Sequence, residues 1–188
     1  MFMLTSLDGF FEGPNHDLSW HNVDDEFNTF AVEQTSSVDT LLFGRRTYQL
    51  FESFWPNAPK DPKMSKEDLE IARLINNMNK IVFSKTLKEV REKENWKNVK
   101  LMREVNPKEI QTLKRQPGKI IAIFGSNNLA VSFLGKGLLD EVRILVNPVV
   151  IGKGTQLFKG LKEKQNLKLI KTRIFKSGNV LLYYQPTK

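Results

Sequence analysis

The sequence predicts an α/β protein built around a mostly parallel sheet, with antiparallel strands added at its C-terminal end. Two observations predict this class. Short apolar runs alternate with helical patterns as far as about residue 135, and strand patterns dominate after that point. The chain also shows no internal linker, and its 188 residues are enough to bury one core, so we expect a single domain over residues 1–188.

The N-terminal half contains three helical patterns. The first begins at Asn22 or Asp24 and has apolar residues at helical spacing, and the third opens with Ser65-Lys-Glu-Asp, a capping-box pattern. The elements expected here are a strand at 1–5, a loop at 6–21, a helix ending near 37, a strand at 40–43, a helix at 44–51, a loop at 55–62 and a helix at 65–77.

The second half changes from alternating elements to strands. Asn106-Pro107 places proline at the favoured first position of a helix, and Lys176-Ser-Gly-Asn179 is typical of a hairpin turn. The elements expected here are strands at 80–83 and 99–102, a helix ending near 115, a strand at 119–124, a helix at 126–134, a strand at 140–149, a turn at 152–155, and strands at 167–175 and 180–184.

Composition and charge exclude several classes of protein. The chain has no cysteine, which excludes disulfides and thiolate chemistry, and we expect no metal site. No window approaches the roughly 20 apolar residues of a membrane span, and the N-terminal segment lacks the basic start of a signal peptide, so we expect a cytoplasmic protein. The net charge of +8 fits a nucleic acid or a small polyanionic ligand, but the lysines are spread along the chain, which favours the small ligand.

Two segments follow the same plan. Each is a short apolar run, then Phe-Gly, then polar residues that open a helical pattern; the glycines are Gly44, followed by Arg45-Arg46-Thr47, and Gly125, followed by Ser126-Asn127. A helix N-terminus presents unpaired N–H groups and a partial positive charge, which suit an anion such as phosphate. Two such junctions therefore indicate one ligand with several phosphates, although each alone is more typical of an ordinary strand–turn–helix connection.

A third strand end has the same chemistry. The strand at 80–83 is followed by Ser84-Lys85-Thr86. Neighbouring parallel strands bring their carboxyl ends to one edge of a sheet, where ligands bind in open α/β folds. Arginine forms forked hydrogen bonds to phosphate and hydroxyl groups add further donors, so these three strand ends together predict a phosphate-binding edge.

With these residues in view, the chain resembles the dihydrofolate reductase-like superfamily, and in particular stand-alone bacterial proteins similar to the reductase domain of the riboflavin-biosynthesis deaminase–reductase. The order and spacing of the matching motifs span nearly the whole chain. These motifs are Ser6-Leu-Asp-Gly-Phe10, Gly13-Pro14, Leu18-Ser-Trp20, Asp39 to Tyr48, Lys80 to Thr86, Phe124-Gly-Ser126, Leu139 to Arg143 and Pro148 to Gly154.

The resemblance implies a three-layer fold with helices on both faces of the sheet and a reductase that uses NADPH. It implies that the Gly-Arg-Arg-Thr and Ser-Lys-Thr segments hold the phosphates and that basic residues select the 2′-phosphate. Many relatives have Gly-Gly where this chain has Gly125-Ser126. The cofactor-binding residues implied in this way are Thr5, Trp20, Gly44, Arg45, Arg46, Thr47, Ser84, Lys85, Thr86, Gly125, Ser126, Asn127 and Leu129.

Two carboxylates are candidate catalytic groups on the substrate side. The segment from Trp20 to Phe27 resembles the part of dihydrofolate reductases that carries the pterin-binding carboxylate, which places Asp25 in that role; alternatively, Asp25 belongs to the acidic first turn of a helix. Asp8 lies in Ser-Leu-Asp-Gly and is either a turn residue or a second carboxylate near the nicotinamide.

Three functions remain open at this stage. The first is an NADPH-dependent reductase of a heterocyclic or ribosylamine substrate, similar to 5-amino-6-(5-phosphoribosylamino)uracil reductase. The second is dihydrofolate reduction with Asp25, and the third is a non-catalytic module that binds a nucleotide or a nucleic acid. The riboflavin-type substrate contacts are incomplete here, because Tyr48-Gln-Leu replaces an Asp-Asp-Pro segment and Ile123 replaces an acidic residue. The apolar C-terminal hairpin also predicts a homodimer.

Overall fold

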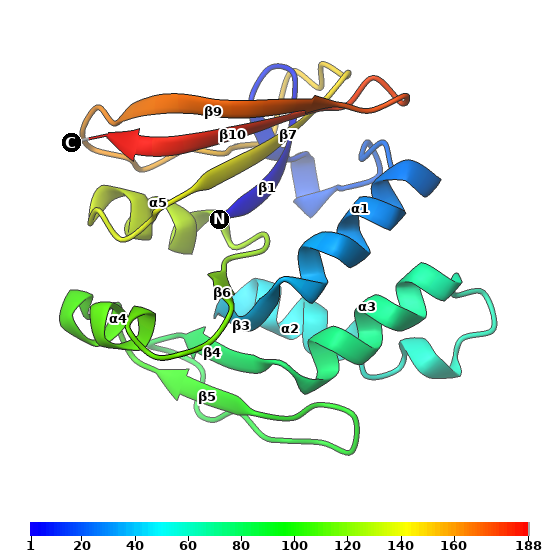
Figure 1. Ribbon diagram of the computed structural model, residues 1–188, viewed down its shortest axis with the longest axis vertical. Helices are drawn as coiled ribbons and strands as arrows, with labels where there is room; N and C mark the ends of the chain where they lie inside the picture. Colours follow the sequence, from blue (N-terminus) through cyan, green and yellow to red (C-terminus); the bar gives the residue numbers. More distant parts are fainter. Residues whose placement is uncertain (188) are drawn as a thin grey trace. The chain divides into compact units, whose positions relative to one another are not determined.

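The computed structural model describes residues 1–187, which form five α-helices and ten strands (Figure 1). The helices are α1 (Asp25–Ser36), α2 (Arg45–Phe54), α3 (Lys66–Asn77), α4 (Pro107–Lys114) and α5 (Asn127–Gly135). The strands are β1 (Phe2–Ser6), β2 (Phe10–Glu12), β3 (Val38–Gly44), β4 (Asn79–Phe83), β5 (Val99–Met102), β6 (Ile120–Ala122), β7 (Val142–Asn147), β8 (Thr155–Gln156), β9 (Asn166–Ile174) and β10 (Val180–Thr187). Two short 3₁₀ helices cover Pro14–His16 and Ala58–Lys60.

The described chain divides into two compact units. Unit 1 contains residues 1–26 and the segment from residue 127 onward, whereas unit 2 is the continuous stretch Phe27–Ser126. Each unit has its own four-stranded sheet. The α/β class with parallel strands and an antiparallel C-terminal hairpin is confirmed, and its strands are shared between these two sheets. The single-domain assignment stays a prediction.

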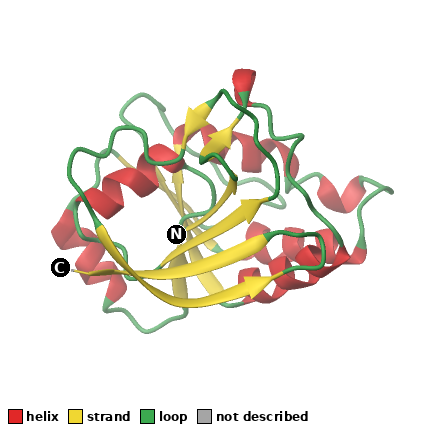
Figure 2. Cartoon of the chain, turned by 90° about the horizontal axis from the view of Figure 1, so that it is seen from above, coloured by secondary structure: helices red, strands yellow, loops and turns green. Residues whose placement is uncertain are grey.

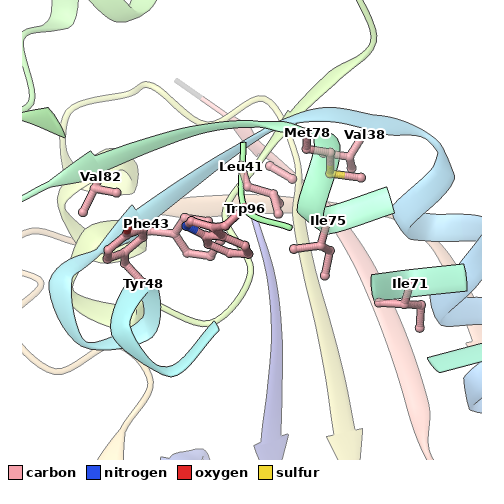
Figure 3. Packing of buried hydrophobic residues seen from close by; sticks show 10 residues of the cluster. Val38, Leu41, Phe43, Tyr48, Ile71, Ile75, Met78, Val82 and Trp96 are labelled. Carbon is pink, nitrogen blue, oxygen red and sulfur yellow. The ribbon is translucent and has the colours of Figure 1, made fainter. Parts of the chain in front are cut away.

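Unit 2 is the parallel part of the fold. Its strands run in the order β5-β4-β3-β6, and every neighbouring pair is parallel. The central strand β3 is almost wholly buried, as expected for a parallel strand covered on both faces. In Figure 3, Phe43 of this strand packs near Tyr48 of α2 and Trp96 of the loop before β5, within the apolar core of the unit.

A buried lysine joins two segments of unit 2. The Lys80 side chain has no exposed surface, and its Nζ donates to the carbonyl oxygens of Asn76, Met78 and Lys97 at 3.0, 2.9 and 2.9 Å. The ammonium also lies 4.4 Å from the centroid of the Trp96 ring. These contacts attach the end of α3 and the loop before β5 to the start of β4.

Unit 1 carries the antiparallel hairpin. Its strand order is β1-β7-β10-β9, with β1 parallel to β7 and the other pairs antiparallel. The long hairpin strands β9 and β10 lie side by side in both views (Figures 1 and 2). The turn between them falls at Lys176-Ser-Gly-Asn179, where Gly178 has a φ of +85°, so the predicted hairpin turn is confirmed.

Most predicted elements are present within a few residues of their expected bounds. The capping box at Ser65 is confirmed, because the Ser65 hydroxyl accepts from the Asp68 N–H and the Asp68 carboxylate accepts from the Ser65 N–H. The strands predicted at 119–124 and 140–149 are shorter in the structure, where β6 covers 120–122 and β7 covers 142–147. Helix α2 extends to Phe54, beyond its predicted end.

The sequence reading missed one small sheet. Residues 6–21 and 152–155 were expected to be a loop and a turn, but β2 and β8 pair there as a two-stranded antiparallel sheet. These strands have only three and two residues, which is too short for an alternating pattern to show. Among residues 1–187, no helix is long and apolar enough to cross a membrane.

Candidate phosphate-binding site

The two Phe-Gly junctions are hydrogen-bonded to each other in unit 2. Strands β3 and β6 are parallel neighbours, so the turns that follow them emerge at the same edge of the sheet. The Gly44 N–H donates to the Ser126 hydroxyl oxygen at 3.0 Å, and the Ser126 N–H donates to Thr47 Oγ1 at 3.1 Å. The two junctions therefore lie side by side, as predicted, and are joined by these two hydrogen bonds.

Helix α2 begins with an open N-terminus. Gly44 is its N-cap residue in an extended conformation (φ −78°, ψ 161°), and no side chain of that residue caps the helix. The amide groups of the first turn have no partner within the helix and carry its partial positive charge. Arg45 and Arg46 are exposed at this end, so the helix start combines backbone donors with two guanidinium groups, a combination that suits an anion.

The third strand end joins this site through Arg45. Its Nη1 donates to Thr86 Oγ1 at 3.0 Å, which connects the start of α2 with the loop that follows β4. Lys85 and Thr86 are exposed, so their polar groups are accessible beside the guanidinium. The structure thus brings together Gly44, Arg45, Thr47, Thr86 and Ser126, all of which were predicted from the sequence.

Ser84 is placed differently from the other hydroxyl residues. It is buried, and its hydroxyl oxygen accepts from the N–H groups of Thr86 and Leu87 at 3.3 and 2.9 Å. This pattern is a serine turn, in which the side chain shapes its own loop. Ser84 therefore orders the backbone that presents Lys85 and Thr86.

The sequence reading missed Arg103, which holds the same loop. Its guanidinium donates to the carbonyl oxygens of Ser84, Leu87 and Lys88 at 3.3, 2.5 and 3.1 Å. Arg103 follows directly after β5, the parallel neighbour of β4. A basic residue just past the carboxyl end of a neighbouring strand was the available signal, since that edge had already been assigned to the ligand.

A polar hollow at the other ends of the same strands holds none of the predicted residues. It has a volume of about 530 Å³ and is lined by residues at the starts of β3, β4 and β5, including Asp39, Asn79 and Val99. Asp39 there accepts from the Lys119 N–H at 2.5 Å and from the Thr40 hydroxyl at 2.9 Å. Ligands of open α/β sheets bind at the carboxyl ends of the strands, so we assign the site to the junctions.

The remaining predicted residues belong to unit 1, where Asp8 anchors a loop. Its carboxylate accepts from the N–H groups of Ile151 and Gly152 at 3.2 and 2.8 Å, beyond the end of β7. A hydrogen bond from the Ser6 hydroxyl, followed by these backbone bonds, lowers the pKa of Asp8. Asp8 is therefore ionised at neutral pH and holds the turn, which agrees with its expected turn role.

Asp25 is exposed as the first residue of α1. Its neighbour Glu26 accepts from the Lys176 N–H at 2.9 Å and lies 3.5 Å from the Arg173 guanidinium, so the acidic first turn contacts the hairpin turn within unit 1. The Trp20 Nε1 donates to the Asp17 carbonyl oxygen at 3.1 Å. The roles of Asp25 and Trp20 stay predictions.

Three further residues implied by the resemblance are buried in unit 1. Thr5 lies in β1, where its carbonyl oxygen accepts from the Asn147 amide at 3.1 Å. Asn127 and Leu129 lie in the first turn of α5, and the buried Asn127 Nδ2 has no hydrogen-bond partner among residues 1–187. Their roles in cofactor binding stay predictions.

The parallel strands, the phosphate-compatible turns and the antiparallel hairpin define a dihydrofolate reductase-like α/β protein. The model of the family "RibD C-terminal domain" matches residues 1–183, and the chain belongs to that family. It is 35% identical over 182 residues to the Bacillus subtilis protein YyaP, and this match covers 97% of this chain and 91% of YyaP. The B. subtilis protein YwjB is 25% identical over 185 residues. Both relatives are described as uncharacterized proteins.

Solved structures agree with this assignment. A protein from Shewanella sp. PV-4, assigned provisionally by its name to riboflavin biosynthesis, aligns with a TM-score of 0.71 and 25% identity over 100% of this chain and 97% of that one. The Thermotoga maritima diaminohydroxyphosphoribosylaminopyrimidine deaminase/5-amino-6-(5-phosphoribosylamino)uracil reductase aligns with a TM-score of 0.66 at 15% identity, covering 99% of this chain but 55% of that one. The second likeness supports the fold.

Proposed function

We propose that the protein is an NADPH-dependent reductase that acts on a small heterocyclic or ribosylamine substrate, with 5-amino-6-(5-phosphoribosylamino)uracil as the first compound to test. The observation that carries this proposal is the edge of unit 2 at which the three predicted strand ends meet. There, the uncapped N-terminus of α2 lies beside the Arg45–Thr86 pair and the Ser126 turn. Membership of the RibD C-terminal domain family supports the reductase class.

The donor set of unit 2 fits a phosphorylated dinucleotide. Arg45, Arg46 and Lys85 are three exposed cations on two adjacent strand ends, and guanidinium groups bind phosphate oxygens in a forked geometry. The amide groups of the first turn of α2 add uncharged donors and a positive dipole end. NADPH has both a pyrophosphate and a 2′-phosphate, and when bound it supplies a hydride to the substrate.

The protein must also supply the substrate with a proton or a carboxylate contact. Asp8 is unsuited to donate a proton near neutral pH, because hydrogen bonds from Ser6 and from two backbone amides keep its pKa low. Asp25 is solvent-exposed, and we retain it as the candidate catalytic carboxylate. An Asp25→Asn variant that turns over substrate at the wild-type rate would remove Asp25 from the mechanism.

The proposal is tested by titrating the protein with NADPH and NADH, and by following NADPH oxidation with the aminouracil substrate and, separately, with dihydrofolate. We expect micromolar to submillimolar NADPH binding, and Arg45→Gln should weaken it about tenfold or more. Arg73→Gln is the matched control, because Arg73 is an exposed arginine on α3 that pairs with Glu70. Absence of binding at about 1 mM NADPH would reject the proposal.

A further inference from the structure

Helices α2 and α3 begin in different ways, although both belong to unit 2. In α3, the Ser65 hydroxyl accepts the Asp68 N–H at 3.0 Å, and the Asp68 carboxylate accepts the Ser65 N–H at 3.2 Å. These two bonds close both halves of a capping box. Helix α2 has glycine at the N-cap, so the half that would satisfy its first-turn amides is missing.

The other half of the α2 cap is supplied by a residue distant in sequence. The N-cap amide of Gly44 donates to the Ser126 hydroxyl oxygen at 3.0 Å. Thr47, at the position where α3 has Asp68, accepts from the Ser126 N–H at 3.1 Å instead of bonding to its own N-cap residue. Ser126, in the turn that follows β6, therefore accepts the N-cap N–H of α2, as the N3 side chain does in a capping box.

We infer that Ser126 is a positioning residue for the proposed cofactor: it caps Gly44 from the neighbouring turn and donates its own hydroxyl proton to a phosphate oxygen bound at α2. This inference rests on the proposed function. It explains why the first-turn amides of α2 lack a side-chain cap while the N-cap amide has one. A ligand oxygen then fills the half of the capping box that Gly44 leaves empty.

The conformation of the turn supports a dedicated role for the serine. Gly125 and Ser126 both have left-handed backbones, with φ values of +62° and +51°. Such a φ is unfavourable for serine, whereas glycine adopts it freely. A Cβ at Gly125 would lie 3.2 Å from Thr47 Cγ2, so a side chain there would require Thr47 to shift by a few tenths of an ångström, whereas Ser126 keeps its side chain despite the strain. Its two hydrogen bonds to α2 offset that strain.

The Ser126 hydroxyl has one donor left to give. A serine hydroxyl has one donor and two acceptor positions, and the bond from Gly44 uses an acceptor position. No acceptor for the Ser126 proton is present among residues 1–187, although the residue as a whole is only 7% exposed. Accepting the Gly44 N–H polarises the O–H bond, so an anionic oxygen is the favoured partner for the proton.

Two variants separate the hydroxyl from the backbone strain. Ser126→Ala removes the hydroxyl, both as acceptor and as donor, and keeps a Cβ on the left-handed backbone. Ser126→Gly also removes the hydroxyl but relieves the backbone strain. We expect Ser126→Ala to lower the melting temperature by about 3–6 °C because Gly44 loses its acceptor, and Ser126→Gly to lower it less. Both should weaken NADPH binding about tenfold or more, and both should weaken displacement of NADPH by inorganic pyrophosphate.

Ser53→Ala, at the far end of α2, removes a hydroxyl that donates only to the Leu50 carbonyl oxygen and should leave NADPH binding unchanged. If Ser126→Gly binds NADPH as tightly as the wild type, the hydroxyl makes no contact with the phosphate and the inference is wrong. If the wild-type protein itself does not bind NADPH, the proposed function fails first, so the two failures are distinguishable.

Discussion

The buried Lys80 predicts an unusual dependence of stability on pH. Burial lowers the pKa of this ammonium from 10.5 to about 7, and the charge of Glu92 opposes the shift. Between these two pKa values the unfolded chain binds more protons than the folded one. The free energy of unfolding should therefore rise as the pH increases from about 7 to about 10, where most surface lysines leave it unchanged.

The size of the effect follows from the contacts of the ammonium. A shift from 10.5 to about 7 corresponds to at most about 5 kcal/mol between the two protonation states. Three carbonyl acceptors and the face of Trp96 favour the charged form and reduce that figure. We therefore expect the free energy of unfolding to rise by about 1–3 kcal/mol over this pH range.

The substitution Lys80→Met tests this reasoning. The Asn76 carbonyl keeps a bond from the Lys97 N–H at 3.0 Å, but the carbonyls of Met78 and Lys97 each lose the bond from Lys80. At pH 7 the variant should be less stable by about 1–3 kcal/mol, because a buried carbonyl and a part-buried carbonyl each lose a hydrogen bond. Removal of the costly buried charge offsets part of this loss.

Urea unfolding at several pH values between 6 and 10 provides the measurement. Lys100→Met, on the exposed face of β5, is the matched control and should keep both the stability and the pH profile of the wild type within about 0.5 kcal/mol. The reasoning is refuted if the wild-type stability is flat or falls between pH 7 and 10, or if Lys80→Met retains the rise.

Further predictions concern single contacts. Trp96→Ala removes a fully buried ring from the core of unit 2 and should cost about 3–5 kcal/mol in urea unfolding; a cost below about 1 kcal/mol would contradict the packing. Ser65→Ala should cost about 1 kcal/mol through loss of the cap, and an unchanged midpoint would count against it. Asp8→Ala should speed hydrogen exchange at the Gly152 amide at pH 7, and wild-type protein should lose this protection as the pH falls through the lowered pKa of Asp8; equal exchange rates would exclude the anchor. We propose that the edge strand β9 forms a homodimer contact, since Ile174 is 74% exposed there; light scattering should give twice the chain mass, and Ile174→Lys a monomer.

Local signals in the sequence were sufficient where neighbouring residues form the structure. The capping box at Ser65 and the hairpin turn at Gly178 depend on residues within a few positions of each other, and both are present. The proximity of the three strand ends was also predictable, because parallel strands place their carboxyl ends at one edge whatever their side chains. The contact between Arg45 and Thr86 follows from that rule and from the length of an arginine.

Contacts between distant segments were not predictable in the same way. The link from Ser126 to Gly44 depends on the registry of β3 and β6 and on a left-handed serine, for which the sequence carries no signal. The fixed position of Asp8 depends on a loop more than a hundred residues away, so local sequence could not show that its carboxylate accepts from the Gly152 N–H. Arg103 was overlooked because the chain has 29 Lys and Arg residues, and nothing in the local sequence distinguishes this arginine from the others.

The strand order of unit 1 has a consequence for how the chain folds during synthesis. Strand β1 is made well before its partner β7, since Phe2 lies opposite Arg143 in the sheet. Unit 2, by contrast, is one continuous stretch whose strands can pair as soon as residue 126 is made. On the ribosome we therefore expect unit 2 to become structured first. The apolar side chains of Phe2 and Met3, which are buried in the folded unit, stay exposed until β7 has been made. Strand β1 is then accessible to a chaperone throughout the synthesis of unit 2.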